Sequence, residues 1–148
     1  MSRTVCFFAP LRCLHCGALA DEAETRLQTY GLISDPEDRI ARPGEIVELE
    51  PGDLEDGYHK LRDPGADFPI RALEQWGCPR CQWGQWARIE FRRIDREHHE
   101  FVSAQSVELN PQTLGEAHFI SRNLDFWVDS HPGEETQRIL PLIQHLLP

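Results

Sequence analysis

The sequence lacks the features that mark most enzymes and membrane proteins. Its 148 residues contain no glycine-rich phosphate-binding loop, no nucleophile elbow and no His-Glu-x-x-His pattern. Near the N-terminus, the apolar run Val5–Phe8 is too short for the core of a signal peptide or for a membrane span. These absences favour a cytoplasmic protein that is not an enzyme, has no catalytic residues and does not lie in a membrane.

Basic residues are too few to balance the acidic ones, and the net charge is −10. Residues 17–77 contain 15 acidic and 6 basic residues, whereas residues 78–96 are net positive. The arginines of that positive segment are Arg80, Arg88, Arg92, Arg93 and Arg96. A negative field repels the phosphate backbone of nucleic acids and attracts basic partners. The charge therefore favours a basic protein partner over nucleic acid.

Cysteine is the most informative residue type that the chain does contain. Cys13 and Cys16 form one Cys-x-x-Cys pair, and Cys78 and Cys81 form another. Two residues between ligands let both sulfurs of a pair reach one ion, and four thiolates suit Zn²⁺. We therefore expect one structural zinc site with these four ligands. The alternatives are a redox dithiol, two unrelated reduced pairs, or disulfides, which a reducing cytoplasm disfavours. Cys6 lies in an apolar run and is expected to be a small buried hydrophobic residue.

The two pairs, with the strand-like residues beside them, resemble the zinc-ribbon superfamily, in which two knuckles on β-hairpins clamp one zinc ion. The resemblance rests on positions 13–17 and 78–81. Residues 17–77 lie between the pairs, against roughly 15–20 residues in the compact pattern. The sequence thus predicts a zinc ribbon with a long acidic insertion between its knuckles. Four sulfur ligands leave no open position, so the zinc is expected to be structural rather than catalytic.

Residue patterns outside the cysteine pairs predict an α+β fold in one domain, residues 1–148. Residues 1–109 are expected to form its β-rich part, with strands near the N-terminus and at residues 45–50. The clearest strand pair is a hairpin of residues 87–94 and 101–109, in which apolar and polar residues alternate.

Residues 110–148 are predicted to form a helical C-terminal region. Asn110 and Pro111 are a typical helix start, since Asn is a favoured N-cap and Pro suits the first helical position. Residues 114–128 continue from it with apolar residues at helical spacing. A second helix is expected over residues 134–147. The sequence therefore predicts two C-terminal helices behind the zinc ribbon.

Tryptophan is concentrated around the second cysteine pair, as Trp76, Trp83 and Trp86. Two interpretations stay open. The rings form a stacking platform for nucleic-acid bases or a peptide, or they cover the metal site of a small β module. Together with the arginines of residues 78–96, the first interpretation indicates a nucleic-acid-binding or transcription accessory protein.

Acidic side chains between the two pairs are the candidate partner-binding residues. They are Asp35, Glu37, Asp38, Glu45, Glu48, Glu50, Asp53, Glu55 and Asp56. Complementary charge speeds encounter with a basic partner and rejects wrong ones; a merely solvated surface is the alternative. The sequence thus predicts a non-enzymatic, zinc-stabilised protein-binding module. Its size, acidity and lack of catalytic motifs resemble those of a bacterial immunity protein that neutralises a basic toxin.

Overall fold

The structure is a computed structural model that describes residues 5–21, 26–28, 39–48, 58–65, 69–121 and 141. Strands predominate among these residues, and the one helix has six residues. The strands are β1 (Val5–Phe8), β2 (Leu11–Arg12), β3 (Leu19–Ala20), β4 (Arg26–Gln28), β5 (Arg39–Ala41), β6 (Ile46–Glu48), β7 (Tyr58–Lys60), β8 (Ile70–Gly77), β9 (Gly84–Arg93), β10 (His98–Val107) and β11 (Phe119–Ser121). The helix, α2 (Pro111–Glu116), lies between β10 and β11.

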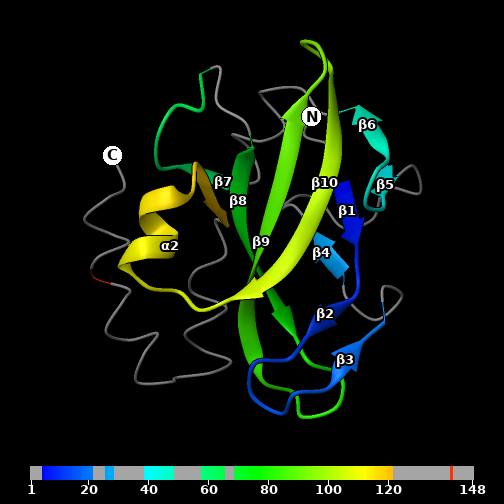
Figure 1. Ribbon diagram of the computed structural model, residues 1–148, viewed down its shortest axis with the longest axis vertical. Coiled ribbons are helices and arrows are strands. Elements are labelled where there is room, and N and C mark those ends of the chain that lie inside the picture. Colours follow the sequence, from blue (N-terminus) through cyan, green and yellow to red (C-terminus); the bar gives the residue numbers. More distant parts are fainter. Residues whose placement is uncertain are drawn as a thin grey trace.

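A six-stranded sheet in the order β6-β10-β9-β8-β11-β7 forms the centre of the fold. The long strands β8, β9 and β10 make an antiparallel meander through its middle (Figure 1). Alternation explains β9, because Ala87, Ile89 and Phe91 are buried whereas Arg88 and Glu90 are partly exposed. The hairpin predicted from the sequence is confirmed as β9 and β10.

The main core lies on one face of this sheet, against the N-terminal strands. A three-stranded sheet in the order β4-β1-β5 packs there, and the ring of Phe7 in β1 contacts Phe91 and Phe101 at centroid distances of 5.1 Å each. The small β2–β3 hairpin adds Leu11 and Ala20 to the same buried cluster. The N-terminal strands therefore cover one face of the meander.

The opposite face carries a second, smaller core under helix α2. Leu73, Trp86 and Ile120 from the sheet pack with Leu114 and Ala117, which are both fully buried. In Figure 1, α2 lies on the side of the long strands away from β1 and β4. The sheet is thus buried on both faces where it contains β8 and β11. Strands buried in this way lack the alternation of apolar and polar residues that marks a strand in a sequence.

The predicted α+β class with two C-terminal helices is wrong, because the described residues form strands and one short helix. The helix start itself is confirmed: the Asn110 side chain accepts a hydrogen bond from the Thr113 N–H, and the Thr113 hydroxyl accepts one from the Asn110 N–H. The helix ends at Glu116, however, and the chain is extended at Ala117 before it continues as β11.

Burial on both faces explains why the sequence predicts a helix where the structure has β11. Phe119 belongs to the main core and Ile120 to the core under α2, while the strand pairs with β7 and β8. A strand that is apolar on both faces gives a continuous apolar run, which periodicity alone does not separate from a buried helix. Residues 122–128 of the first predicted helix lie outside the described residues, and so does the second predicted helix, 134–147, apart from the single residue Pro141.

The segment between the cysteine pairs, residues 17–77, is more than an insertion appended to a ribbon. It contains β3 to β8 and contributes strands to all three sheets. Its last strand, β8, is central in the large sheet and leads directly into the second knuckle. The two cysteine pairs are therefore held by the main sheet and by the hairpin packed against it.

Candidate metal centre

Each cysteine pair lies in the turn of a β-hairpin, and the two turns have the same hydrogen bonds. In the turn between β2 and β3, Cys13 N–H donates to Ala18 O at 2.8 Å, and Gly17 N–H donates back to Cys13 O at 3.0 Å. In the turn between β8 and β9, Cys78 N–H donates to Trp83 O at 3.1 Å, and Gln82 N–H donates to Cys78 O at 2.8 Å. The matching pattern makes both turns knuckles of one type.

Both knuckles also share a left-handed backbone at the same position, four residues after the first cysteine. That residue is Gly17 in the first knuckle, with φ +79°, and Gln82 in the second, with φ +60°. Glycine adopts this conformation without penalty, whereas a residue with a Cβ atom is strained there. The first knuckle therefore has the favourable residue at this position and the second does not.

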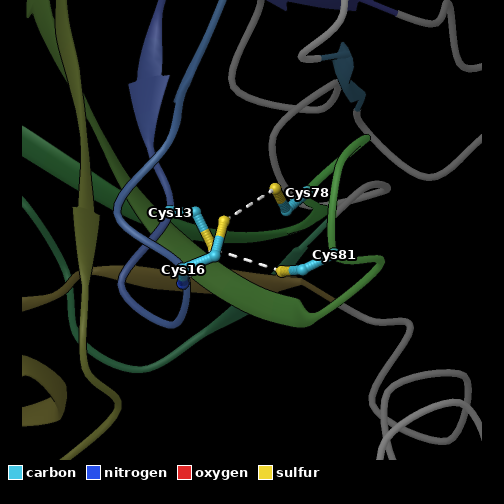
Figure 2. A group of neighbouring side chains, drawn as sticks. All are labelled: Cys13, Cys16, Cys78 and Cys81. Carbon is cyan, nitrogen blue, oxygen red and sulfur yellow. Dashed lines mark hydrogen bonds between the residues drawn. The ribbon is translucent and has the colours of Figure 1, made fainter.

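The four sulfur atoms converge between the knuckles (Figure 2). All four lie within 4.8 Å of one another, and two close separations join one knuckle to the other. Cys13 Sγ lies 3.6 Å from Cys81 Sγ, and Cys16 Sγ lies 3.8 Å from Cys78 Sγ. A tetrahedron with metal–sulfur bonds of about 2.3 Å has edges of about 3.8 Å. The sulfur positions therefore fit a single tetrahedral metal ion.

The same distances bear on two of the alternatives, the disulfides and the two unrelated pairs. All four cysteines are free thiols, and separations of 3.6 and 3.8 Å are far longer than a disulfide bond of about 2.0 Å. Because sulfurs of one knuckle lie 3.6 and 3.8 Å from sulfurs of the other, the two pairs form a single group. The four cysteines thus form one group that could hold a metal ion, in an arrangement compatible with zinc knuckles.

Thiol acidity within the group is strongly uneven. Burial raises the pKa of Cys13, but hydrogen bonds from the Cys16 N–H, the Gln85 side chain and the His15 N–H outweigh it and bring this pKa to about 6. Desolvation and the neighbouring thiols raise the pKa of Cys81 to about 12, against a hydrogen bond from the Trp83 backbone. Adjacent thiols resist joint ionisation, and a cation among them removes that resistance.

Gln85 is a residue of the site that the sequence analysis did not identify. It lies on β9 just beyond the second knuckle and is 5% exposed. Its Nε2 donates to Cys13 Sγ at 3.2 Å, and its Oε1 accepts from the Leu14 N–H at 2.9 Å. A signal was available, because Gln85 is the polar residue in phase with the buried face formed by Ala87 and Ile89.

The tryptophans near the second knuckle have three different environments. Trp76 is buried in the main core with Cys13 and Cys78, whereas Trp86 is buried on the opposite face of the sheet. Trp83 is 40% exposed and stacks on His15, with ring centroids 4.1 Å apart and an angle of 9° between the planes. The interpretation that the rings cover a metal site thus agrees with the position of Trp76. The three tryptophans near the second knuckle do not form an exposed platform, because only Trp83 among them is exposed.

Two of the arginines considered for nucleic-acid binding have acidic partners on their own surface. Arg88 lies 3.3 Å from a carboxylate oxygen of Glu90 and 3.7 Å from one of Glu116. Arg92 forms an ion pair with Glu100 across the β9–β10 hairpin. The second hairpin is therefore less basic than its arginine content indicates.

Only two of the nine predicted partner-binding residues fall in the described part of the chain. Glu45 accepts a hydrogen bond from the Arg42 N–H at 2.7 Å and closes a local turn, and Glu48 is exposed on β6. The others, Asp35, Glu37, Asp38, Glu50, Asp53, Glu55 and Asp56, lie outside the described residues. The structure therefore brings the four metal ligands together but does not test the partner-binding set.

Comparisons with known proteins found no match: no family model, no curated protein and no solved structure is similar to the chain. No helix among the described residues is long and apolar enough to cross a membrane.

Proposed function

We propose that this protein is a non-enzymatic protein-binding module of the zinc-ribbon type, built around one structural Zn²⁺. The observation that carries the proposal is the set of four sulfurs, two from each knuckle, within 4.8 Å of one another, with two separations close to a tetrahedral edge. Zinc suits such a site because it takes thiolate ligands in a tetrahedron and has no redox chemistry of its own. With four protein ligands the ion has no open position for a substrate, which supports a structural role.

The zinc would join two parts of the fold that are far apart in the sequence. Cys13 comes from the small β2–β3 hairpin and Cys78 from the end of β8, and both are buried in the main core. The short β2–β3 hairpin has only two residue pairs of its own. A short hairpin of this kind is marginally stable in isolation. Metal binding would therefore supply much of the free energy that holds it on the sheet.

A basic protein is the partner that the charge favours. The chain carries a net charge of −10, and the four thiolates with one Zn²⁺ add further negative charge. We place the protein in the cytoplasm, where its thiols stay reduced, and propose that its acidic segments cover a basic surface on the partner. Neutralisation of a basic toxin by an immunity protein is an activity of this kind.

The metal is tested by native mass spectrometry before and after treatment with a strong chelator. One zinc ion per chain is expected, with loss of that mass after chelation. A native mass that shows no zinc would contradict the metal assignment.

The partner is tested by charge reversal in the acidic segments, after affinity capture from the native host identifies a candidate. Replacing Glu48 and Asp53 by lysine should weaken binding to a basic protein and reduce its dependence on salt. Glu108→Lys is a matched control, since Glu108 is exposed and lies outside those segments. Equal binding by the control and the charge-reversed variants would refute the acidic docking surface.

Nucleic acid is the second candidate partner, and the exposure of Trp83 is the observation that favours it. Arg93 and Arg96 are exposed as well. Titration of labelled single-stranded oligonucleotides at two salt concentrations separates the candidates. Salt-dependent binding that Trp83→Ala and Arg93→Ala both weaken would support nucleic acid and displace the protein-partner proposal.

A further inference from the structure

Gln85 makes three hydrogen bonds at the metal centre although it is not a candidate ligand. One N–H donation goes from Nε2 to Cys13 Sγ at 3.2 Å, and another goes to Trp83 O at 3.2 Å. The Oε1 atom accepts from the Leu14 N–H at 2.9 Å. Gln85 belongs to the strand that leaves the second knuckle, but Cys13 and Leu14 belong to the first. Its carboxamide therefore ties the two knuckles together independently of a metal.

The location of this side chain indicates that its hydrogen bonds matter. Gln85 is 5% exposed and lies on the face of β9 that also buries Ala87 and Ile89. A buried amide is costly unless its polar atoms are satisfied, and an apolar residue at this position would leave the Leu14 N–H without this acceptor. Gln85 thus combines a buried polar side chain with three hydrogen-bond partners, namely Cys13 Sγ, Trp83 O and the Leu14 N–H.

Cys13 differs from the other ligands of the group in the donors that surround it. Its sulfur accepts the Gln85 bond and also lies within 3.3 Å of the His15 nitrogen and 3.4 Å of the Cys16 nitrogen. Groups that hydrogen-bond a metal ligand fix its orientation and tune its binding, and their loss typically costs about 10–100-fold in metal affinity. Of these three donors, Gln85 supplies the one from a side chain, which substitution can remove.

We propose that Gln85 is a positioning residue of the metal centre, one that sets the affinity and the release rate of the zinc ion. Its amide oxygen holds Leu14, and with it the first knuckle, against β9. Its N–H group orients the Cys13 sulfur toward the other three sulfurs and stabilises the thiolate. The four ligands are therefore close to their binding geometry before a metal arrives. This inference rests on the zinc site proposed above.

Two substitutions separate positioning from simple space filling. Gln85→Glu keeps the size of the side chain and an acceptor for the Leu14 N–H, but it removes the donor to Cys13 Sγ. Gln85→Met keeps the approximate volume and removes both functions. Gln105→Glu is the matched control, because Gln105 is exposed on β10 and its side-chain oxygen accepts from Arg88, away from the metal centre.

The experiment measures zinc affinity by competition with a chromophoric chelator, and zinc release from the loaded protein, for all four proteins. Both Gln85 variants should bind zinc about 10–100-fold more weakly than the wild type and release it faster, whereas Gln105→Glu should match the wild type. With Co²⁺ in place of zinc, the thiolate charge-transfer band should shift in Gln85→Glu. Exchange of the Leu14 amide hydrogen should quicken in Gln85→Met but not in Gln85→Glu.

Release from the loaded protein remains informative even for a variant that does not fold without metal. Wild-type release rates and an unchanged Co²⁺ spectrum in Gln85→Glu would overturn the positioning role. Such a result, with one zinc still bound to the wild type, would leave the structural zinc site intact. Absence of zinc from the wild type itself would instead overturn the metal assignment and this inference with it.

Discussion

Glu74 provides a test of the core that is independent of the metal. Its side chain is 5% exposed in the middle of β8, with Ser121 on the adjacent strand β11 and Tyr58 on β7, the strand beyond β11. The Gln75 N–H donates to Oε1 at 3.1 Å, while Oε2 is buried without a hydrogen-bond partner. Burial raises the pKa of Glu74 from 4.5 to about 8, in spite of the hydrogen bond from the Gln75 N–H, which acts in the opposite direction.

The sign of the pH dependence follows from this raised pKa. The folded protein keeps Glu74 protonated at neutral pH, whereas the unfolded chain ionises it near pH 4.5. Its contribution to stability is therefore fully present below pH 4.5 and is lost as the pH rises toward 8. At about 1.4 kcal/mol per pKa unit, the loss over that range is up to roughly 5 kcal/mol.

The substitution Glu74→Gln should remove this dependence, because glutamine does not ionise. Its amide brings a constant cost of about 1–3 kcal/mol if a buried N–H lacks a partner, so the slope and not the absolute stability is the readout. Urea unfolding in excess zinc at several values between pH 5 and 8 gives the free energy of unfolding of variant and wild type. The variant should gain several kcal/mol relative to the wild type across this range.

Zinc binding at the proposed site would contribute a pH dependence of opposite sign, because thiols must lose protons to bind the metal. The difference between variant and wild type removes this shared contribution. Glu108→Gln, at an exposed position, should show no change of slope. Parallel stability curves for Glu74→Gln and the wild type would refute the assignment of a protonated carboxyl group in the core.

Five further substitutions test the knuckles and the helix. Either Cys13→Ser or Cys81→Ser should abolish stoichiometric zinc binding in native mass spectra and lower the melting temperature markedly, since metal-binding energy is folding energy in such modules; an unchanged melting temperature would count against this. Gln82→Gly should raise the free energy of unfolding by about 1 kcal/mol, because the left-handed position no longer carries a Cβ atom, whereas Gly17→Ala should lower it by a similar amount. Chemical denaturation measures both, and a destabilised Gln82→Gly variant would contradict the strain. Asn110→Ala should cost about 1 kcal/mol through loss of the helix cap, which thermal unfolding would detect and which an unaltered transition would disprove.

The group of four cysteines that could hold a metal ion was predictable from sequence, because the chemistry of metal ligands fixes their spacing. Two residues between cysteines suit one ion, whichever fold surrounds them, so Cys13, Cys16, Cys78 and Cys81 could be assigned together. Gln85 was not predicted, because its role depends on the distance between two knuckles that only the fold brings together. The information that marks it is weak in the sequence: one polar residue in an otherwise apolar strand face.

The β9–β10 hairpin was predictable for a related reason, since a strand with one apolar and one polar face shows its period directly. The helix after Asn110 was predicted to be too long because β11 has no polar face. Phe119 and Ile120 point into two different cores, and their burial depends on β7 and β8, which precede them by many residues. Local propensity fixed the cap correctly, but long-range pairing decided where the helix ended.

The long separation between the cysteine pairs strengthens the case for a metal clip. Closing a flexible loop costs conformational entropy that grows with the logarithm of its length, by about 0.6 kcal/mol for each doubling. Residues 17–77 are roughly two doublings longer than the compact ribbon spacing of about 15–20 residues. A metal that joins Cys13 to Cys78 therefore restricts the unfolded chain by about 1 kcal/mol more than it would in a compact ribbon. In the folded state β8 already places Cys78 in the core, so the metal adds little further loss of conformational entropy there. The stabilisation by metal should therefore be larger than the small size of the β2–β3 hairpin indicates.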